Sequence, residues 1–321
     1  MAGKKRSGYG IPVVIALLCL IFLVFYLINA DSSLSFSENM KNIWGDIPTE
    51  RTDSSNSTAG GAFGDDASGK MLYYQIDVGN ADSILIVAPT GETMLVDAGE
   101  DADYAKIAQV LYDNRVEQID CLVMTHPHAD HIGAMDEIIE DFNVQKFYVS
   151  NTPGDTTTYS NVINAAEDRG LDLTIAAAGM QDTLGGISIR FFNPIMDTYD
   201  DMNESSIVML LTYGQTKFLL TGDIESASLA DMVYAYSHAL DCDVLKTAHH
   251  GSANATSREF LEATTPSIAV ISCGADNSYG HPHAETLALL DEFGATVLRS
   301  DLNGDIRILS DGTNVTYATQ K

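Results

Sequence analysis

The feature that most constrains this chain is a short segment, Met124–Ala134, that is crowded with metal-binding side chains. It reads Met-Thr-His-Pro-His-Ala-Asp-His-Ile-Gly-Ala and places within six residues His126, His128, Asp130 and His131. Crowding three imidazoles and a carboxylate is costly unless a partner compensates them. A divalent cation does so, because neutral imidazole and ionised carboxylate are good ligands for zinc and similar metals. The aspartate alone could cap a helix, but a cap does not explain three histidines. The segment therefore predicts a metal site.

This segment is predicted to lie in a loop between a strand and a helix. The run Ile119–Thr125 is mostly apolar and indicates a buried strand, whereas Ile132–Phe142 has helical spacing. Loops of this kind are where α/β proteins usually place their sites. In so tight a turn, the first two histidines can point to one side, and the aspartate and the third histidine to the other. We therefore expect one or two divalent metal ions, zinc or manganese, with two adjacent positions.

Further candidate residues follow other predicted strands. Seven of the eight histidines fall in three short stretches at strand ends, and only His238, predicted on a helix, stands apart. Asp223 follows the apolar run Phe218–Leu220, where a carboxylate can bridge two cations, although capping of the next helix is an alternative. Asp97 has the same placement after its own strand and is expected to orient the ligands or the loop backbone.

Two adjacent histidines, His249 and His250, end the predicted strand Val244–Thr247. Neighbours in such a turn point in different directions, so one can bind metal while the other faces substrate or a hydrogen-bond partner. We assign His249 to the metal and His250 to catalysis, although the sequence leaves this division open, and a turn without chemistry is the alternative. Nearby, Ser252 is a candidate for substrate binding, and Lys246 for contact with a phosphate unless it is a surface residue.

Composition limits the mode of substrate binding. The chain has 321 residues, and its hydrophobic content of 45% is enough for a sizeable core. The formal net charge of −28 and the pI of about 4.3 indicate an acidic surface, with no electrostatic footprint for nucleic acid. A nucleic-acid substrate would therefore have to be held locally, by metals and a few cations.

Residues 1–30 are predicted to form a membrane anchor or a signal segment. Three basic residues in Met1–Gly10 precede the uncharged, largely apolar run Ile11–Ile28, which would span about 27 Å as a helix. Basic residues before such a run keep the N-terminus in the cytoplasm, so the rest of the chain would face outward. The length of the run favours an uncleaved single-pass anchor, and cleavage after Ala30 with secretion is the alternative.

Residues 31–70 are rich in small and polar residues and are predicted to be a flexible linker. Residues 71–321 are predicted to form the folded domain, an α+β domain with two sheets face to face and helices outside. Strands are predicted at Met71–Val78, Ser83–Ala88, Thr93–Val96, Ile119–Thr125, Lys146–Val149, Leu173–Ile175, Ile187–Phe191, Ser206–Tyr213, Lys217–Leu220, Val244–Thr247, Ile268–Ser272, Thr296–Arg299, Asp305–Leu309 and Val315–Ala318. Helices are predicted at Tyr104–Asn114, Ile132–Phe142, Tyr159–Arg169, Glu225–Ala239, Ser257–Ala263 and Ala284–Phe293.

The histidine segment resembles the signature of the metallo-β-lactamase superfamily, whose fold is a four-layer αββα sandwich. Asp97, Asp223 and His249 match the superfamily's further metal-site motifs in order. The resemblance narrows to the hydrolase domain of ComEC-type DNA-uptake proteins and covers about Met71 to Leu309. The motifs that carry it are Ile76–Ser83, Asn203–Ser206, Thr221–Asp223, Leu245–Ser252, and Gly274–Asn277 through His281–Pro282.

The chain departs from both patterns. Large ComEC-type proteins carry a many-helix membrane channel, whereas this chain has one apolar span. It also has no histidine between His131 and His238, where many superfamily members keep a metal ligand. Asn203 occupies roughly that place. The first metal is therefore expected to be held by His126 and His128 with water or Asn203.

The resemblance implies an extracytoplasmic metal-dependent hydrolase, with a phosphodiester such as DNA as the favoured substrate. Metals would polarise a phosphoryl oxygen and lower the pKa of bound water. Asp130 can also orient the attacking water, and His281 can stabilise developing charge or protonate the leaving oxygen. Asp77, in the first of the motifs, is expected to support the ligands.

Two alternative functions stay open, one enzymatic and one not. The same scaffold can hydrolyse another substrate, such as a teichoic-acid phosphodiester, a lactone or a β-lactam. A module that retains metal without turnover could instead capture DNA at the cell surface. The expected partners are the membrane, through the N-terminal segment, and other proteins of an uptake machinery.

Overall fold

The structure is a computed structural model and describes residues 69–321. The predicted anchor, residues 1–30, and nearly all of the predicted linker lie outside the described residues, so both stay predictions. Among the residues that are described, no helix has both the length and the apolar character that crossing a membrane requires.

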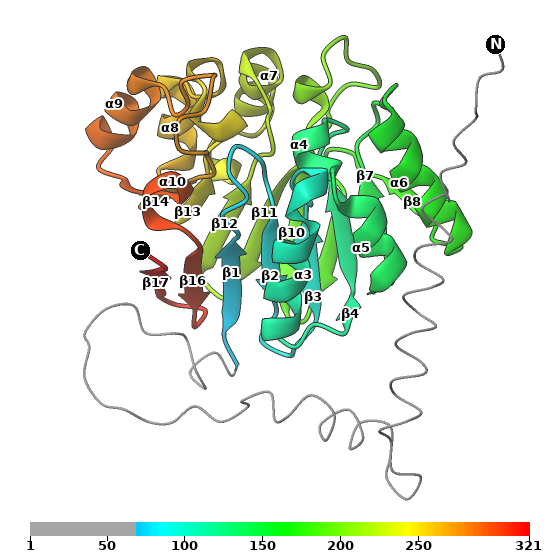
Figure 1. The fold of residues 1–321 in the computed structure, drawn as a ribbon. Coiled ribbons are helices and arrows are strands. Elements are labelled where there is room, and N and C mark those ends of the chain that lie inside the picture. Colours follow the sequence, from blue (N-terminus) through cyan, green and yellow to red (C-terminus); the bar gives the residue numbers. More distant parts are fainter. Residues whose placement is uncertain (1–68) are drawn as a thin grey trace, which may run out of the picture. The chain divides into compact units, whose positions relative to one another are not determined.

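Two large β-sheets form the centre of the domain (Figure 1). The first contains, in spatial order, β17 (Val315–Thr319), β16 (Ile306–Ser310), β1 (Met71–Gln75), β2 (Ile84–Val87), β3 (Thr93–Val96), β5 (Cys121–Met124), β7 (Phe147–Val149) and β8 (Leu173–Ile175). The second contains β15 (Thr296–Arg299), β14 (Ile268–Ile271), β13 (Val244–Lys246), β12 (Thr216–Leu220), β11 (Val208–Tyr213), β10 (Ile187–Asn193) and β9 (Gln181–Leu184). A small parallel pair joins β4 (Gln118–Ile119) to β6 (Asn143–Val144).

Helices cover the outer face of each sheet. On the first sheet these are α3 (Tyr104–Asp113), α4 (Ala129–Ile132), α5 (Met135–Asp141) and α6 (Thr157–Asp168). On the second sheet they are α7 (Ser226–Tyr236), α8 (Arg258–Thr264) and α9 (Ala284–Glu292), while the short α10 (Ser300–Asn303) follows β15. Polar side chains cap some of these helices: the hydroxyl of Ser257 accepts a hydrogen bond from the backbone N–H of Phe260 at the start of α8.

Three layers of buried apolar side chains hold the four layers of secondary structure together. Successive residues of each central strand point to opposite faces of the sheet. In β5, for example, Leu122 packs under the helices and Val123 packs between the sheets. Between the sheets, the rings of Tyr73 and Phe218 stack with their centroids 6.0 Å apart. The predicted αββα sandwich is therefore confirmed.

The direction of the strands determines where a site can form. β3, β5, β7 and β8 are parallel neighbours in the first sheet, and β12, β13, β14 and β15 are parallel neighbours in the second. The carboxyl ends of parallel neighbours lie at one edge of a sheet, and the loops that follow them gather there. Both sheets therefore contribute such loops to the candidate site.

Several predicted elements differ from the observed ones. The predicted helix Ile132–Phe142 is interrupted, because α4 ends at Ile132 and α5 begins only at Met135. The predicted helix Glu225–Ala239 ends as α7 at Tyr236 and continues as a 3₁₀ turn. Neither β9 nor the β4–β6 pair was predicted, since these strands are short and partly polar and lack the apolar alternation that marks a strand.

Candidate metal centre

The candidate metal centre is built from loops that follow parallel strands. Asp97 comes directly after β3, and the histidine segment begins just after β5. In the second sheet, Asp223 lies beyond the end of β12, and His250 lies beyond the end of β13. Strand pairing therefore brings together side chains that are far apart in the sequence.

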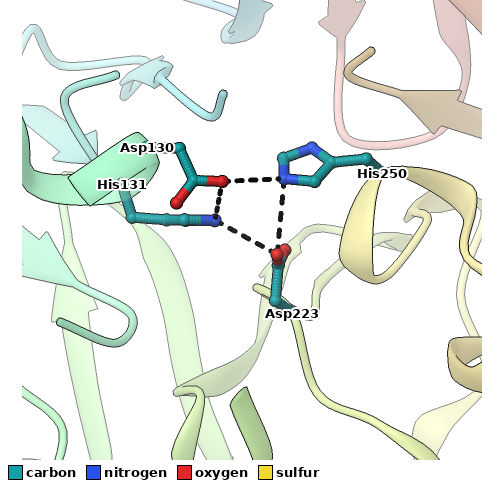
Figure 2. A group of neighbouring side chains, drawn as sticks. All are labelled: Asp130, His131, Asp223 and His250. Atoms are coloured by element: carbon teal, nitrogen blue, oxygen red, sulfur yellow. Dashed lines mark ion pairs between the residues drawn. The ribbon is translucent and has the colours of Figure 1, made fainter. Parts of the chain in front are cut away.

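Four of these side chains, which we call the metal group, converge on one point: Asp130, His131, Asp223 and His250 (Figure 2). Oδ2 of Asp223 lies 3.3 Å from Nε2 of His131 and 3.3 Å from Nε2 of His250. Oδ2 of Asp130 lies 3.9 Å from the first of these nitrogens and 3.5 Å from the second. Three members are buried, and the side chain of Asp130 is 31% exposed. The group is thus nearly enclosed but can be reached by solvent at one residue.

The metal group has the geometry and the chemistry that a divalent metal requires. One ligand atom from each of its four side chains lies within 4.8 Å of the others. Ligand atoms bound at about 2.0–2.2 Å to one zinc ion are necessarily separated by no more than about 4.4 Å, so only a small adjustment is needed. Nε2 of His131, Nε2 of His250 and Oδ1 of Asp223 are buried and make no hydrogen bond, although the nitrogens lie within ion-pairing distance of the aspartate. Since unpaired buried polar atoms are costly, these residues fit a metal ion.

His126 and His128 provide a second pair of donors beside the metal group. Nε2 of His126 lies 3.1 Å from Nδ1 of His128, close enough for both nitrogens to bind one ion. The ring of His126 also packs against that of His131, with a distance of 4.1 Å between the centroids. The predicted division of the histidine segment into two adjacent sets of donors agrees with this arrangement.

Asp97 contacts His131 on the side of its ring that faces away from the metal group. Oδ2 of Asp97 lies 2.8 Å from Nδ1 of His131, which leaves Nε2 to face the metal group. The same carboxylate accepts hydrogen bonds from the backbone N–H and the hydroxyl of Thr125, at 2.9 and 2.7 Å. Asp97 thus fixes the orientation of a metal-group histidine, as the sequence predicted, and such outer contacts typically raise metal affinity.

Lys246 lies beneath the metal group, not at its mouth. Its side chain is 1% exposed, and Nζ lies 2.8 Å from Oδ2 of Asp82. Asp82 also accepts a hydrogen bond from the hydroxyl of Ser272, and the carbonyl oxygen of Ser272 lies 3.1 Å from Nδ1 of His250. The Lys246–Asp82 pair therefore supports His250 through Ser272. The predicted contact of Lys246 with a substrate phosphate requires an exposed ammonium group, and the structure contradicts it by burying that group.

The pKa values of the two histidines of the metal group are shifted in the opposite direction from that of neighbouring His126. Burial alone would lower the pKa of His131, but nearby carboxylates, Asp223 first among them, outweigh burial and raise that pKa well above its usual value. The same balance of burial against carboxylates raises the pKa of His250 to about 9. Burial, and then the nearness of His131, lowers the pKa of His126 well below its usual value. Before a metal binds, the carboxylates therefore favour the protonated forms of His131 and His250, and burial favours the neutral form of His126.

The two adjacent histidines take places that reverse the predicted assignment. His249 and His250 both have left-handed backbone angles, with φ of 46° and 51°, which are uncommon for residues other than glycine. His250 enters the metal group, whereas Nδ1 of His249 pairs with Oε1 of Glu225 at 2.8 Å, and its Nε2 remains 3.8 Å from Asp223. The geometry therefore favours His250 as the ligand and turns His249 toward the rim of the site.

Asn203 and Ser252 lie near this rim. Nδ2 of Asn203 is 3.5 Å from the same Glu225 oxygen that holds His249, and its Oδ1 is buried and makes no hydrogen bond. That oxygen is available as a ligand, and the predicted role of Asn203 stays a prediction. The hydroxyl of Ser252 accepts a hydrogen bond from the backbone N–H of Asn254, so it caps a short turn. Its predicted contact with substrate is likewise untested.

Asp77 does not lie behind the ligands as predicted. Its carboxylate interacts with the backbone N–H of Gly79 and with Lys321. The supporting role belongs instead to Asp82, which lies in the same motif and which the sequence argument did not single out. The sequence does contain a sign that such a carboxylate exists. Lys246 ends an otherwise apolar strand that is predicted to be buried, and a buried ammonium group requires a carboxylate partner.

His281 lies beside the metal group, on the loop between β14 and α9. The centroid of its ring is 5.4 Å from that of His249 and 6.3 Å from that of His250. Burial, and then the neighbouring imidazoles, lower the pKa of His281 to about 4, so the ring is neutral at physiological pH. Its Nδ1 makes no hydrogen bond. The ring can therefore offer an N–H to a bound substrate, and its predicted catalytic role stays a prediction.

An αββα sandwich with aspartates and histidines at the ends of its parallel strands is the arrangement of one large class of proteins. The sequence matches the metallo-beta-lactamase superfamily over residues 76–275, which is more than half of the chain. The chain therefore belongs to the metallo-β-lactamase superfamily, whose members are generally metal-dependent hydrolases.

Within this class, the curated relatives include a ComE operon protein and a competence protein. ComE operon protein 3 of Bacillus subtilis (strain 168) is 28% identical over 249 residues, which cover 72% of this chain and 32% of that protein. Competence protein ComA of Neisseria gonorrhoeae is 28% identical over 232 residues, which cover 72% of this chain and 31% of that protein. The chain thus spans about a third of the length of these relatives. The resemblance to ComEC-type proteins is confirmed.

A solved structure also aligns with this chain, at lower sequence identity. The metallo-beta-lactamase fold protein YhfI from Bacillus subtilis aligns with a TM-score of 0.48 and 14% identity, covering 72% of this chain and 96% of that protein.

Proposed function

We propose that the chain is a metal-dependent phosphodiesterase that acts on DNA or a related phosphodiester. The observation that carries this proposal is the convergence of the metal group, with its unpaired buried atoms, beside the donor pair of His126 and His128. Two adjacent metal positions suit phosphate esters, because they can stabilise both the attacking and the leaving oxygen of an in-line displacement. The relatives named for competence support a nucleic acid as the substrate.

Each residue of the site has a task in this proposal. Metals bound there would supply Lewis-acid activation of the phosphoryl group and of water. Oδ2 of Asp223 lies 3.3 Å from both His131 and His250 and would serve the ion of the metal group, while its Oδ1, which is buried and makes no hydrogen bond, would be left for a second ion. Asp130, the exposed member of the metal group, orients the attacking water. The neutral ring of His281 donates an N–H toward the charge that develops on the phosphoryl oxygens.

A turnover screen of the purified full-length chain tests the proposal. With Mn²⁺ or Zn²⁺ added, the substrates are bis-p-nitrophenyl phosphate, single-stranded DNA, a poly(glycerol phosphate) teichoic acid, a lactone and a chromogenic cephalosporin. We expect turnover of the phosphodiesters, loss of that turnover in His131→Ala, and full activity in His238→Ala, whose histidine is exposed and outside the site. Turnover of the lactone or the cephalosporin alone would contradict the proposal. DNA binding without any turnover would favour a capture module.

We further propose that a single N-terminal anchor holds the domain on the outer side of the cell membrane, where it can meet an uptake machinery. The basic start and the apolar run Ile11–Ile28 support this topology. Protease added to intact cells should cut within residues 31–70 and release the domain. A domain that is fully protected and recovered from the cytosol would reject the topology, whereas release without protease would indicate signal cleavage and secretion.

A further inference from the structure

An exposed tyrosine stands at the outer end of a stack of rings that begins in the metal group. The side chain of Tyr279 is 68% exposed. Its ring stacks on that of His281, with centroids 5.7 Å apart and planes inclined by 23°. The His281 ring is in turn inclined by only 26° to the ring of buried His250, at 6.3 Å. One face of Tyr279 is therefore covered by His281, and its high exposure leaves the outer face open to another flat group.

The loop that carries Tyr279 is held in a defined shape. Asn277 bridges it internally, since its Nδ2 donates to the carbonyl of His281 at 2.6 Å and its Oδ1 accepts from the N–H of His281 at 3.0 Å. His283 ties it to the neighbouring loop, because its Nδ1 accepts a hydrogen bond from the backbone N–H of Ala253 at 2.9 Å. A ring presented on such a loop loses little conformational freedom when a ligand binds.

The loops around the metal group offer few charges that attract a phosphodiester. Residues 125–134, 247–257 and 274–283 contain no lysine or arginine. Lys246, next to the second of these ranges, is buried against Asp82. Attraction of cationic side chains to phosphates, which dominates most nucleic-acid binding, is therefore weak at this site, and the net charge of −28 opposes it. Apart from the metals, affinity for such a substrate must come from contacts that do not depend on charge.

We propose that Tyr279 binds a nucleobase of the substrate at least one nucleotide away from the scissile phosphate, and that the substrate is therefore single-stranded nucleic acid. This inference rests on the proposed phosphodiesterase function and narrows its substrate. Stacking of a base on an aromatic ring needs no charge and tolerates any sequence, because every base has a flat π-face. Bases of a single strand can be splayed out to reach such a ring, whereas a duplex keeps its bases paired inside. A glycerol-phosphate polymer has no flat ring to offer.

Titration calorimetry on the full-length protein with Mn²⁺ tests the proposal directly. The probes are a phosphorothioate-linked hexathymidylate and an abasic hexamer with the same backbone. The variants are Tyr279→Ala, Tyr279→Phe, which keeps the ring, and Tyr317→Ala, which removes an exposed tyrosine on β17. We expect the base-bearing probe to bind about 5- to 150-fold more tightly than the abasic one, the range that removal of a stacking aromatic produces. Tyr279→Ala should abolish this preference, and the other two variants should keep it.

The outcomes separate this inference from the proposed function. Equal binding of the two probes, no measurable binding of either, or a base preference that survives in Tyr279→Ala would overturn the stacking role, even if the turnover screen finds a phosphodiesterase. A base preference that Tyr279→Ala removes would support the stacking role, even if no phosphodiester is hydrolysed and the proposed activity fails. Tighter binding of a phosphorothioate-linked hairpin with a stable GC-rich stem than of the single strand would overturn the assignment of the substrate.

Discussion

Replacing Lys246 by methionine should destabilise the domain more than any surface ion-pair substitution, because it leaves a buried carboxylate without its partner. The side chains of Lys246 and Asp82 are only 1% and 3% exposed, and their charged atoms lie 2.8 Å apart. Removing one member of such a pair typically costs about 3–5 kcal/mol. In a domain of this size, each kcal/mol lost lowers Tm by about 2–4 °C, so Tm should fall by roughly 6–20 °C.

The chain offers a matched control on the neighbouring strand. Lys217 on β12 pairs with Asp241 at 2.9 Å, but these side chains are 37% and 49% exposed. Because solvent screens this pair, Lys217→Met should cost no more than about 1 kcal/mol. Unfolding of the metal-free proteins is followed by far-UV circular dichroism in urea and on heating. The double variant Asp82→Asn with Lys246→Met should recover most of the loss, since it removes both charges. Equal destabilisation by Lys246→Met and Lys217→Met would refute the reasoning.

Three further predictions concern the metal centre. In the metal-free chain, the pKa of His250 is raised to about 9, so its protonation stabilises the fold. This contribution is complete below the unfolded-state pKa near 6.5 and is lost as the pH rises through 9. The urea midpoint should therefore fall over that range, and a midpoint that rises would contradict this. Asp97→Asn, which weakens the hold on His131, should lower metal affinity about 10–100-fold in a competition assay with a chelator, and unchanged affinity would reject the positioning role. His281→Ala should lower kcat at least about 100-fold while the metal content is retained. His128→Ala should lose both metal and activity. Equal loss of metal in the two variants would make His281 a ligand.

Much of the fold follows from local patterns in the sequence. Thr93–Val96, Leu173–Ile175 and Thr296–Arg299 are strands with the predicted bounds. Polar residues, Glu92 and Asp97, limit the first of these runs on both sides. β9 escaped prediction, since its sequence Gln-Asp-Thr-Leu has no strand signal of its own and depends on pairing with β10. Local pattern therefore predicts the central strands better than the edges, where tertiary pairing decides.

The site was predictable to the extent that ligands cluster along the chain. The histidine segment concentrates its donors within a few residues, and their chemistry alone indicates a metal. The choice between His249 and His250 depends on two consecutive left-handed residues, which composition does not encode. The partner of Lys246, Asp82, lies in the loop between β1 and β2 of the other sheet and in a distant part of the sequence, so only the packing of the two sheets identifies it.

The central claim is that the metal group binds divalent metal, and elemental analysis tests it most directly. The full-length chain is stripped with a chelator, reconstituted with Zn²⁺ or Mn²⁺, freed of excess metal and measured by inductively coupled plasma mass spectrometry. The donor set predicts about one to two equivalents of metal per chain. Less than about a tenth of an equivalent, far below the single ion that this set of ligands should hold, would contradict the account.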